Sequence, residues 1–250
     1  MRLKIINPNT TWGMTRSVEA SANAIARTET EITAVSPRRG PVSIESYYDE
    51  QIAIMGVLEE VLLGEKEEFD AYIIACFGDP GLFAAREITQ APVIGIAEAA
   101  MLTACMLAPK FSVLTVLARS QMITEELIHK YGLWGRCASL RTTGLTVLDF
   151  EHNPGKGAEA LKEAGRAAVL EDGAEALLLG CAGMAGLEEE IEKELQVPVI
   201  NGVAAAVKMA EGLCDMKKRT SKIRTYAWPE KKEISGYNSL WQFDQDRERK

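Results

Sequence analysis

The chain has 250 residues, of which 47% are hydrophobic and 26% are charged, and its formal net charge at pH 7 is −8. A chain of this length can bury a substantial core, as one large domain or as two small ones. The negative charge argues against binding to nucleic acid or an anionic membrane, because either partner requires a basic face. The one basic cluster, residues 217–219, is predicted to be solvated surface.

The N-terminal segment, Met1 to Ile6, has the pattern of a first strand and lacks the long apolar region of a signal peptide. No run of about 18 uncharged apolar residues occurs, which argues against a membrane span. The five cysteines are an odd number and show no CxxC spacing, which argues against a disulfide framework or a zinc ribbon. We therefore expect free thiols and a cytoplasmic location.

Short runs rich in Val, Ile and Leu alternate along the chain with longer segments of helical periodicity. This alternation is typical of a parallel sheet covered by helices and predicts an α/β fold. The predicted strands are residues 3–6, 32–35, 71–75, 93–94, 112–115, 145–148, 176–179 and 199–200. A first helix is predicted from Thr10 or Thr11 to about Arg27, and apolar residues at helical spacing predict further helices around 54–62 and 161–168.

The strand predicted at 71–75 is followed by Cys76 and then by Gly78-Asp79-Pro80-Gly81. This tetrapeptide predicts a helix start, with Asp79 as the N-cap and Pro80 as the first helical residue. Cys76 would then lie between the carboxyl end of a strand and the beginning of a helix. Open α/β sheets bind their ligands at that edge.

A second segment repeats this arrangement, because Cys181 follows the strand predicted at 176–179 and precedes a helical segment. Cys76 and Cys181 are 105 positions apart, and Pro92 and Pro198 are 106 positions apart. We expect two similar lobes with one cleft between them, residues 1–99 joined by about 207–220, and residues 100–206. Residues 221–250 are basic, aromatic and contain proline, and are predicted to form a C-terminal arm on the surface or on a neighbouring subunit.

A thiol at the edge of each lobe suggests two thiols that face each other across one cleft. A free thiol has a pKa near 8.5, and the N–H groups of a helix N-terminus favour its thiolate form. The same N–H groups can hold an oxyanion on a substrate. The alternative is that each cysteine is a small buried side chain, which is the more common role of a single cysteine. We keep that interpretation for Cys105, Cys137 and Cys214, which have no counterpart in the repeat.

Other patterns are weaker. The two histidines, His129 and His152, show no pairing with a cysteine, and no HExxH, P-loop or dinucleotide-binding motif occurs. Asn9 ends the first strand at the same sheet edge and could bind a substrate amide or cap the following turn. Asp79 could act as an acid or base, although a helix cap is the simpler interpretation.

Several separated segments, in this order along the chain, resemble the Asp/Glu/hydantoin racemase superfamily, and most closely its hydantoin and allantoin racemases. They are residues 6–10 (Ile-Asn-Pro-Asn-Thr), 40–45 (Gly-Pro-Val-Ser-Ile-Glu), 75–81 (Ala-Cys-Phe-Gly-Asp-Pro-Gly), 180–184 (Gly-Cys-Ala-Gly-Met), 199–202 (Val-Ile-Asn-Gly) and parts of the tail from 219 to 236. The resemblance covers nearly the whole chain. It implies two pseudo-symmetric α/β lobes and a homo-oligomer.

The resemblance also implies racemisation without a metal, pyridoxal phosphate or nicotinamide, in which two cysteines act as the acid and the base. Cys76 and Cys181 would be that pair. The substrate would contact side chains or backbone amides at positions that match the family's motifs: Asn9, Phe77, Gly78, Asp79, Thr115, Ala182, Gly183 and Gly202. Amino-acid racemases of the superfamily have Cys-Asn-Thr and Cys-Thr at the two sites, whereas this chain has Cys76-Phe77-Gly78 and Cys181-Ala182-Gly183. The missing hydroxyls disfavour a free amino acid and favour a neutral cyclic amide.

The sequence therefore predicts a racemase that interconverts the D and L forms of 5-substituted hydantoins. Allantoin is the nearest alternative substrate. An amino-acid racemase, a decarboxylase of the superfamily and a binding protein without catalysis remain further alternatives. A decarboxylase needs only one thiol, and a binding protein would keep its affinity when its cysteines are replaced by serine.

Overall fold

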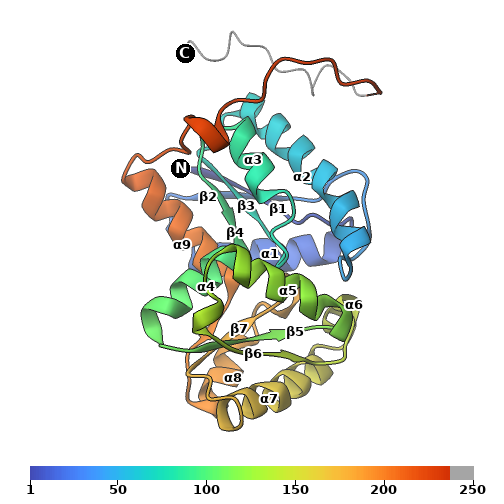
Figure 1. The fold of residues 1–250 in the computed structure, drawn as a ribbon, viewed down its shortest axis with the longest axis vertical. Helices are drawn as coiled ribbons and strands as arrows, with labels where there is room; N and C mark the ends of the chain where they lie inside the picture. The colour runs from blue at the N-terminus through green and yellow to red at the C-terminus, as the bar shows by residue number, and fades with distance from the viewer. Residues whose placement is uncertain (237–250) are drawn as a thin grey trace.

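The computed structural model describes residues 1–236 and contains two parallel four-stranded sheets, stacked one above the other in Figure 1. The first sheet has the order β2 (Glu31–Val35), β1 (Arg2–Ile6), β3 (Ala71–Ile74) and β4 (Val93–Gly95). The second has the order β6 (Cys137–Thr142), β5 (Phe111–Thr115), β7 (Ala176–Leu179) and β8 (Val199–Ile200). The two orders are equivalent, which makes each lobe a copy of the other in topology and confirms the predicted α/β fold.

Helices cover both faces of each sheet. The helices from the first half of the chain are α1 (Trp12–Ile25), α2 (Tyr47–Glu67), α3 (Leu82–Ile88) and α4 (Ile96–Leu107). Those from the second half are α5 (Ala118–Lys130), α6 (Val147–His152), α7 (Pro154–Leu170), α8 (Glu188–Leu195) and α9 (Gly202–Asp215). Short 3-10 turns occur at Trp134–Arg136, Ala182–Met184 and Arg224–Tyr226. No helix within residues 1–236 is long and apolar enough to cross a lipid bilayer.

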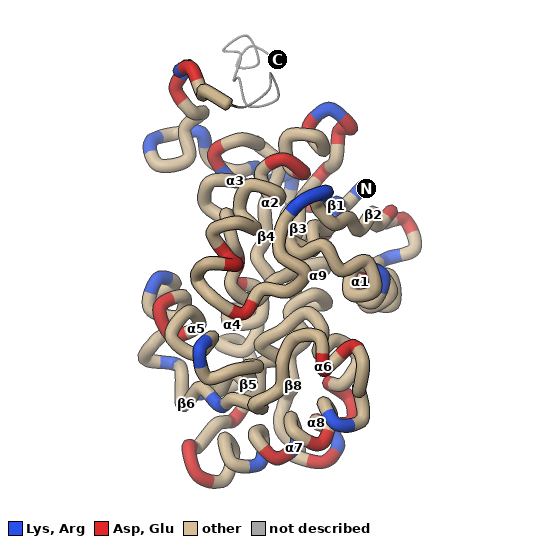
Figure 2. Tube along the Cα trace, turned by 90° about the vertical axis from the view of Figure 1, so that its right-hand side faces the viewer, with Lys and Arg blue, Asp and Glu red and all other residues tan. Residues whose placement is uncertain are grey.

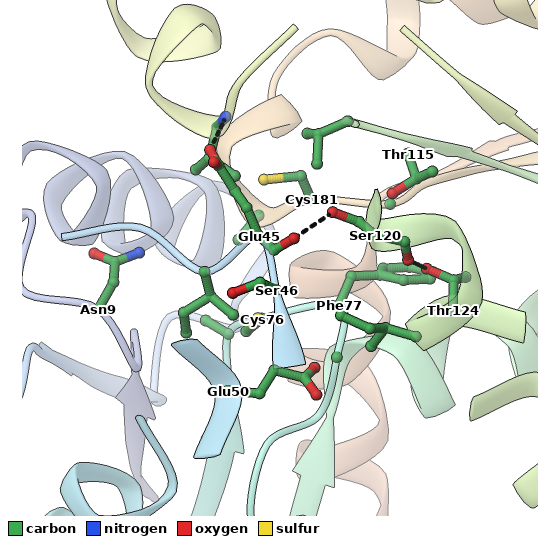
Figure 3. Close-up of a pocket in the computed structure, with 18 of the residues that line it drawn as sticks. Asn9, Glu45, Ser46, Glu50, Cys76, Phe77, Thr115, Ser120, Thr124 and Cys181 are labelled. Atoms are coloured by element: carbon green, nitrogen blue, oxygen red, sulfur yellow. Dashed lines mark hydrogen bonds between the residues drawn. The ribbon is translucent and has the colours of Figure 1, made fainter. Parts of the chain in front are cut away.

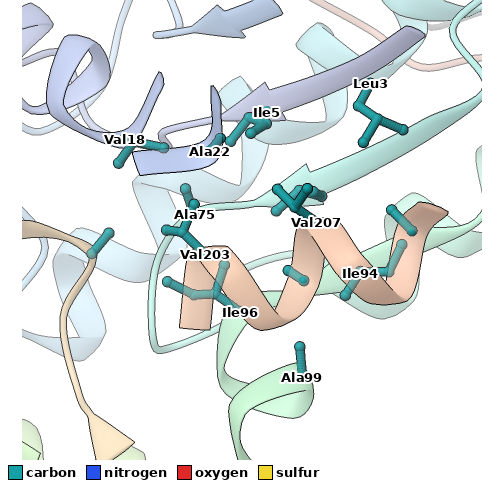
Figure 4. Close-up of a cluster of buried hydrophobic side chains, with 14 of the residues drawn as sticks. Leu3, Ile5, Val18, Ala22, Ala75, Ile94, Ile96, Ala99, Val203 and Val207 are labelled. Carbon is teal, nitrogen blue, oxygen red and sulfur yellow. The ribbon is translucent and has the colours of Figure 1, made fainter. Parts of the chain in front are cut away.

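The lobes exchange one helix each at their boundary. Helix α9 follows the last strand of the second sheet but packs on the first sheet, where Val203 and Val207 join Leu3 and Ile5 in a buried cluster (Figure 4). Helix α4 follows β4 and packs on the second sheet, where Met101 belongs to the same buried cluster as residues of β5 and β7. The exchange fixes the position of one sheet relative to the other, and with it the two strand ends that carry the cysteines.

Seven of the eight predicted strands are present, but the strand predicted at 145–148 is wrong. Leu145 and Val147 are buried, yet they lie in a loop and in the first turn of α6 rather than in a strand. Thr146 and Asp149 form a capping box that begins this helix. The fourth strand of the second sheet is β6, an edge strand whose residues are all only half-buried, and its weaker apolar pattern escaped the prediction.

The predicted helix start at Asp79 is also wrong. Helix α3 begins at Leu82 with Gly81 as its N-cap, and Asp79 has a left-handed backbone with φ of 46°. The Asp79 carboxylate instead accepts hydrogen bonds from the N–H groups of Ala97 and Glu98 and so caps α4. A residue in the first lobe thereby anchors the helix that packs on the second.

The described part of the predicted arm lies on the first lobe. The ring of Tyr226 lies 6.1 Å from that of Phe83 in α3, and the Lys222 ammonium donates to the carbonyls of Arg86 and Glu87. Basic and acidic residues are interspersed along the described trace in Figure 2, and residues 217–219 are exposed as predicted. Tyr237, Trp241 and Phe243, which were assigned to the arm, lie outside the described residues.

Candidate active site

A pocket of about 560 Å³, part of it open to solvent, lies between the lobes and is lined by both Cys76 and Cys181 (Figure 3). Of the other residues predicted to bind substrate, the lining includes Asn9, Phe77, Gly78, Thr115 and Ala182. They come from strand ends and loops of both sheets, which the parallel topology brings to one edge. The pocket is therefore where the carboxyl edges of the two sheets face each other, as expected for open α/β folds.

Cys76 lies directly beyond β3, where the N–H of Ala75 still donates to the carbonyl of Ile6 in the sheet. The Cys76 side chain is half-buried, and its removal from water raises the thiol pKa well above its ordinary value. The backbone N–H of Gly78 acts in the opposite direction and lowers that pKa by favouring the thiolate. The negative charges of Glu50, Cys181 and Asp79 raise it further.

Cys181 occupies the equivalent position beyond β7. It begins a 3-10 turn, and the N–H of Gly183 donates to its sulfur atom at 3.4 Å. Burial raises the pKa of the Cys181 thiol to about 11, the Gly183 N–H lowers it, and the charge of Glu45 raises it. Each cysteine thus has a glycine N–H two residues later that favours its thiolate, and a carboxylate that opposes it.

The remaining cysteines do not line this pocket. Cys105 and Cys137 pack against one apolar cluster of the second lobe, and Cys214 packs against the cluster of the first. Their positions agree with the structural role assigned to them. Among residues 1–236, no three His, Cys, Asp or Glu side chains gather in a way that could hold a metal ion.

Asn9 has one of the two roles that its sequence left open, because it caps the turn after β1. Its side-chain oxygen accepts hydrogen bonds from the side chain of Asn7 and from the N–H of Thr11, and so holds the turn that precedes α1. Within residues 1–236, its NH2 group donates only to the sulfur of Met14, at 3.6 Å. Because that is a weak acceptor, the amide can still donate to a substrate carbonyl in the pocket.

Three predicted binding residues do not line the pocket. Asp79 is buried, and its carboxylate already accepts from Ala97, Glu98 and the hydroxyl of Tyr131, at 2.6 Å for the last. Gly183 donates its N–H to the Cys181 sulfur but is not among the lining residues. Gly202 begins α9 against the carbonyl of Ile96, where a Cβ atom would come within 2.7 Å of that oxygen. Asp79 and Gly202 therefore support the helices around the pocket rather than its contents.

The sequence interpretation missed the parts of the pocket that are formed by α1, by the segment before α2 and the first turn of that helix, and by the second lobe. These lining residues are Met14, Ile44, Glu45, Ser46, Glu50, Val116, Ser120, Ile123, Thr124 and Val147. Ser46 caps α2 by accepting from the N–H of Asp49, and this Ser-x-x-Asp signature could have located the start of α2. The long-range contacts that bring this helix to the second lobe left no local signal.

Glu45 connects the two lobes across the pocket. Its carboxylate accepts a hydrogen bond of 2.8 Å from the N–H of Val147 at the start of α6, and its carbonyl accepts from the hydroxyl of Ser120 in α5. In Figure 3, Glu45 lies between Cys181 of the second lobe and Cys76 of the first. Glu45 thereby fixes one wall of the pocket.

Glu50 lies in the first turn of α2 with its carboxyl group in the pocket, on the Cys76 side (Figure 3). Among residues 1–236, no side chain or backbone group makes a hydrogen bond with this carboxyl. Burial first, and the neighbouring Asp79 charge second, raise the pKa of Glu50 to about 7. The carboxyl approaches Gly78 so closely that a Cβ atom at that position would collide with it.

The chain is similar to known proteins over nearly its whole length. The family model described as Asp/Glu/Hydantoin racemase matches residues 3–210. The chain is 56% identical to a hydantoin racemase of Pseudomonas sp. strain NS671, over 94% of this chain and 95% of that protein.

Two solved structures are similar over nearly their whole length. An allantoin racemase from Klebsiella pneumoniae has a TM-score of 0.94 and 49% identity, and the match covers 96% of this chain and 98% of that one. An allantoin racemase from Pseudomonas fluorescens has a TM-score of 0.92 and 40% identity, with 94% of this chain and 100% of that one covered. The similarity extends through both lobes.

Proposed function

The chain belongs to the Asp/Glu/hydantoin racemase family, and we propose that it interconverts the D and L forms of 5-substituted hydantoins by proton transfer between Cys76 and Cys181. The observation that carries this proposal is that the equivalent cysteines of the two lobes line one pocket. The hydantoin carbon C5 lies next to a carbonyl group, so an anion formed there is delocalised onto oxygen. The substrate thus provides its own electron sink.

In the proposed reaction one cysteine, as a thiolate, removes the proton from C5 and leaves an enolate. The opposite cysteine, as a thiol, then delivers its proton to the other face of C5. Atoms and charges balance, because the enzyme ends with thiol and thiolate exchanged. Backbone N–H groups beyond each cysteine and the amide of Asn9 would donate to the ring oxygens. Positioned donors of this kind contribute about 3 kcal/mol each to an oxyanion-like transition state.

The raised thiol pKa values fit a resting enzyme in which both cysteines are protonated near neutral pH. Only the minor form with one thiolate starts the reaction. Its population grows as the pH rises, and the N–H groups of Gly78 and Gly183 increase it by favouring the charged sulfur. Catalysis therefore depends on these two donors as well as on the sulfur atoms.

Racemisation of a single enantiomer tests the proposal. The apolar lining residues Met14, Ile44, Ile123 and Val147 suggest L-5-isobutylhydantoin as a substrate. We expect its optical rotation to fall to zero in the presence of the enzyme, without change in the ultraviolet spectrum or in the mass of the compound. A rotation that decays no faster than in buffer, for this and other 5-alkylhydantoins, would overturn the proposal.

Allantoin, a hydantoin with a ureido group at C5, is the second candidate substrate, because both solved structures described above are allantoin racemases. The same assay with enantiopure allantoin distinguishes the two. We expect a higher kcat/KM for the alkylhydantoin. A much higher value for allantoin would assign the chain to that substrate while leaving the two-thiol chemistry intact.

The proposal includes a reducing, cytoplasmic environment, since a disulfide between the two reactive thiols would abolish proton transfer. All five cysteines are unpaired within the described chain. It also includes a homo-oligomer with no nucleic-acid or membrane partner. Light scattering in solution tests the assembly, and a mass of one chain, 27.4 kDa, would contradict it.

A further inference from the structure

The charged side chains of the pocket are all acidic. Among the described lining residues, Glu45 and Glu50 carry carboxyl groups, and no Lys, Arg or His is present. An additional negative charge in this partly desolvated space would meet like charges without a compensating cation among these lining residues. The composition of the pocket therefore points to selection by charge.

The carboxylates of Glu45 and Glu50 differ in their hydrogen-bond partners. Glu45 accepts from the N–H of Val147, and that donor balances part of its charge. The Glu50 carboxyl has no such donor among residues 1–236, and it lies against Gly78, two residues from Cys76. Its charge therefore acts mainly within the pocket, on whatever occupies the space beside Cys76.

We propose that Glu50 is a specificity residue whose carboxylate excludes substrates with a negatively charged C5 substituent and so restricts the pocket to uncharged cyclic ureides. This inference rests on the proposed function and adds a substrate class to it. Two unit charges several ångströms apart in a partly buried site repel by enough to change an association constant about tenfold or more. The effect requires Glu50 to be ionised.

The ionised fraction of Glu50 changes near neutral pH. Its pKa is about 7, since burial and the charges of Asp79 and Glu126 raise it while Lys130 lowers it. These groups approach from the loop beyond β3 and from α5, and Cys76 is the further titratable group on that side. The charge barrier should therefore be present above pH 7 and diminish as the pH falls to 6.

A pair of substrates with nearly equal shape tests the proposal. They are L-5-(2-carboxyethyl)hydantoin and L-5-(2-carbamoylethyl)hydantoin, which differ by one negative charge. The substrate carboxylate has an ordinary pKa of about 4.3 and stays ionised from pH 6 to 8. We expect the ratio of kcat/KM values, carbamoyl over carboxylate, to be about tenfold or more at pH 8 and to fall toward pH 6 as Glu50 is protonated.

Three variants sharpen the test. Glu50→Gln should lower the ratio and make it independent of pH, and Glu50→Asp, which retains the charge, should keep its pH dependence. Glu126→Gln serves as a control, because Glu126 acts on the charge of Glu50 but lies outside the pocket lining. This variant should also keep the pH dependence of the ratio. The measurement on the unaltered enzyme does not depend on whether any variant folds.

The outcomes separate this inference from the proposed function. If both compounds racemise with a ratio near one at pH 6 and 8, the charge selection is wrong and the racemase assignment stands. A ratio in Glu50→Gln that keeps the pH dependence of the unaltered enzyme would also reject Glu50 as its source. Racemisation of neither compound, nor of any alkylhydantoin, would reject the proposed function itself.

Discussion

The Cys76 and Cys181 halves of the pocket share one backbone plan and differ in the side chains around it. In both, a buried central strand ends in a cysteine, and the N–H of the glycine two residues later favours the thiolate. The Cys76 half adds Glu50 and the buried Asp79, whereas the Cys181 half adds Glu45, whose charge is partly balanced by a backbone donor. Burial is the largest cause that raises the pKa of both thiols, and the pKa is raised further at Cys76, where the charges of Glu50, Cys181 and Asp79 add to it, than at Cys181.

The two glycines show the same contrast. At Gly78 a Cβ atom would collide with the Glu50 carboxyl, so the end of that side chain would have to move. At Gly183 the nearest atoms to such a Cβ would be the terminal carbon of Met14 at 3.5 Å and the Cys181 sulfur at 3.6 Å, which are ordinary contacts. The repeat thus conserves the position of an N–H donor, while the reason for a glycine differs between the lobes.

The largest expected effect follows from removing either thiol, and it tests whether the two halves are equally required. Cys76→Ser and Cys181→Ser should each lower the rate of racemisation by about a thousandfold or more, because a hydroxyl is a far weaker acid and base than a thiol. Polarimetry of L-5-isobutylhydantoin measures it.

Cys105→Ser provides the matched control for these variants, since Cys105 lies in an apolar cluster outside the pocket. It should keep a rate close to that of the unaltered enzyme. A racemisation rate that survives in Cys76→Ser or Cys181→Ser would break the equivalence of the halves and leave only one thiol with a role.

The next largest effect follows from the different space for a Cβ atom at Gly78 and at Gly183. Gly78→Ala should displace the Glu50 carboxyl beside Cys76 and lower kcat/KM by about tenfold, which is less than the loss of about a hundredfold expected when reacting atoms themselves are misplaced, because that carboxyl is the flexible end of a side chain. Gly183→Ala should cost much less, because a Cβ atom there would make only ordinary van der Waals contacts. Steady-state kinetics of both variants compares them, and equal losses would show that the two glycines serve one common purpose.

The different carboxylates beside the two cysteines predict a smaller effect, which is a change in the thiol pKa values. Glu45→Gln should lower the pKa of Cys181 from about 11, because its charge is one of the causes that raise it. Glu50→Gln should lower the pKa of Cys76 and leave that of Cys181 nearly unchanged.

Alkylation by iodoacetamide as a function of pH, followed by mass spectrometry at each cysteine, measures these pKa values. A lower pKa moves the rise in alkylation rate to lower pH. If Glu45→Gln shifts the profile of Cys76 as much as that of Cys181, the carboxylates do not act on separate halves.

The smallest effect on the pocket is expected from Glu211 of α9, which lies outside its lining. Its carboxylate accepts from the N–H of Arg27, the hydroxyl of Thr30 and the ammonium of Lys208. Burial alone would raise its pKa, but these donors outweigh burial and lower the pKa to about 2. The ionised group therefore stabilises the fold at neutral pH, and this contribution is lost as the pH falls from about 5 to 2.

Glu211→Gln should thus lower the free energy of unfolding at pH 7 by about 2 kcal/mol. Thermal unfolding followed by circular dichroism measures the loss, and at pH 3 the difference between variant and unaltered protein should be smaller. Racemisation at 25 °C should remain close to that of the unaltered enzyme. A loss of activity as large as that of Gly78→Ala would mean that α9 controls the pocket directly.

The repeat explains why much of the fold could be predicted. The strands that end in cysteine are short, fully buried and apolar, and β7 has the predicted bounds, 176–179. The half-buried edge strand β6 lacked that pattern, and the buried Leu145 and Val147 imitated it. An apolar run in the sequence predicts that a segment is buried, but it does not always predict whether that segment is a strand, a loop or a helix.

The site was predicted only where it follows the strand ends. Cys76, Cys181, Asn9 and Thr115 lie at such ends and line the pocket. Glu45 and Glu50 reach it through contacts between segments that are far apart in the chain, as in the hydrogen bond from Val147 to Glu45. Asp79 was misplaced because its helix-capping pattern is satisfied by α4 rather than by the adjacent α3.

Solvent exchange at C5 tests the two-sided arrangement most directly. In deuterated water each cysteine should exchange the C5 hydrogen of the enantiomer whose hydrogen faces it, and mass spectrometry records the label before racemisation is complete. We predict that Cys76→Ser loses exchange with one enantiomer while retaining some with the other, and that Cys181→Ser shows the reverse preference. Equal loss of exchange for both enantiomers in each variant would contradict a pocket in which the thiols act from opposite faces.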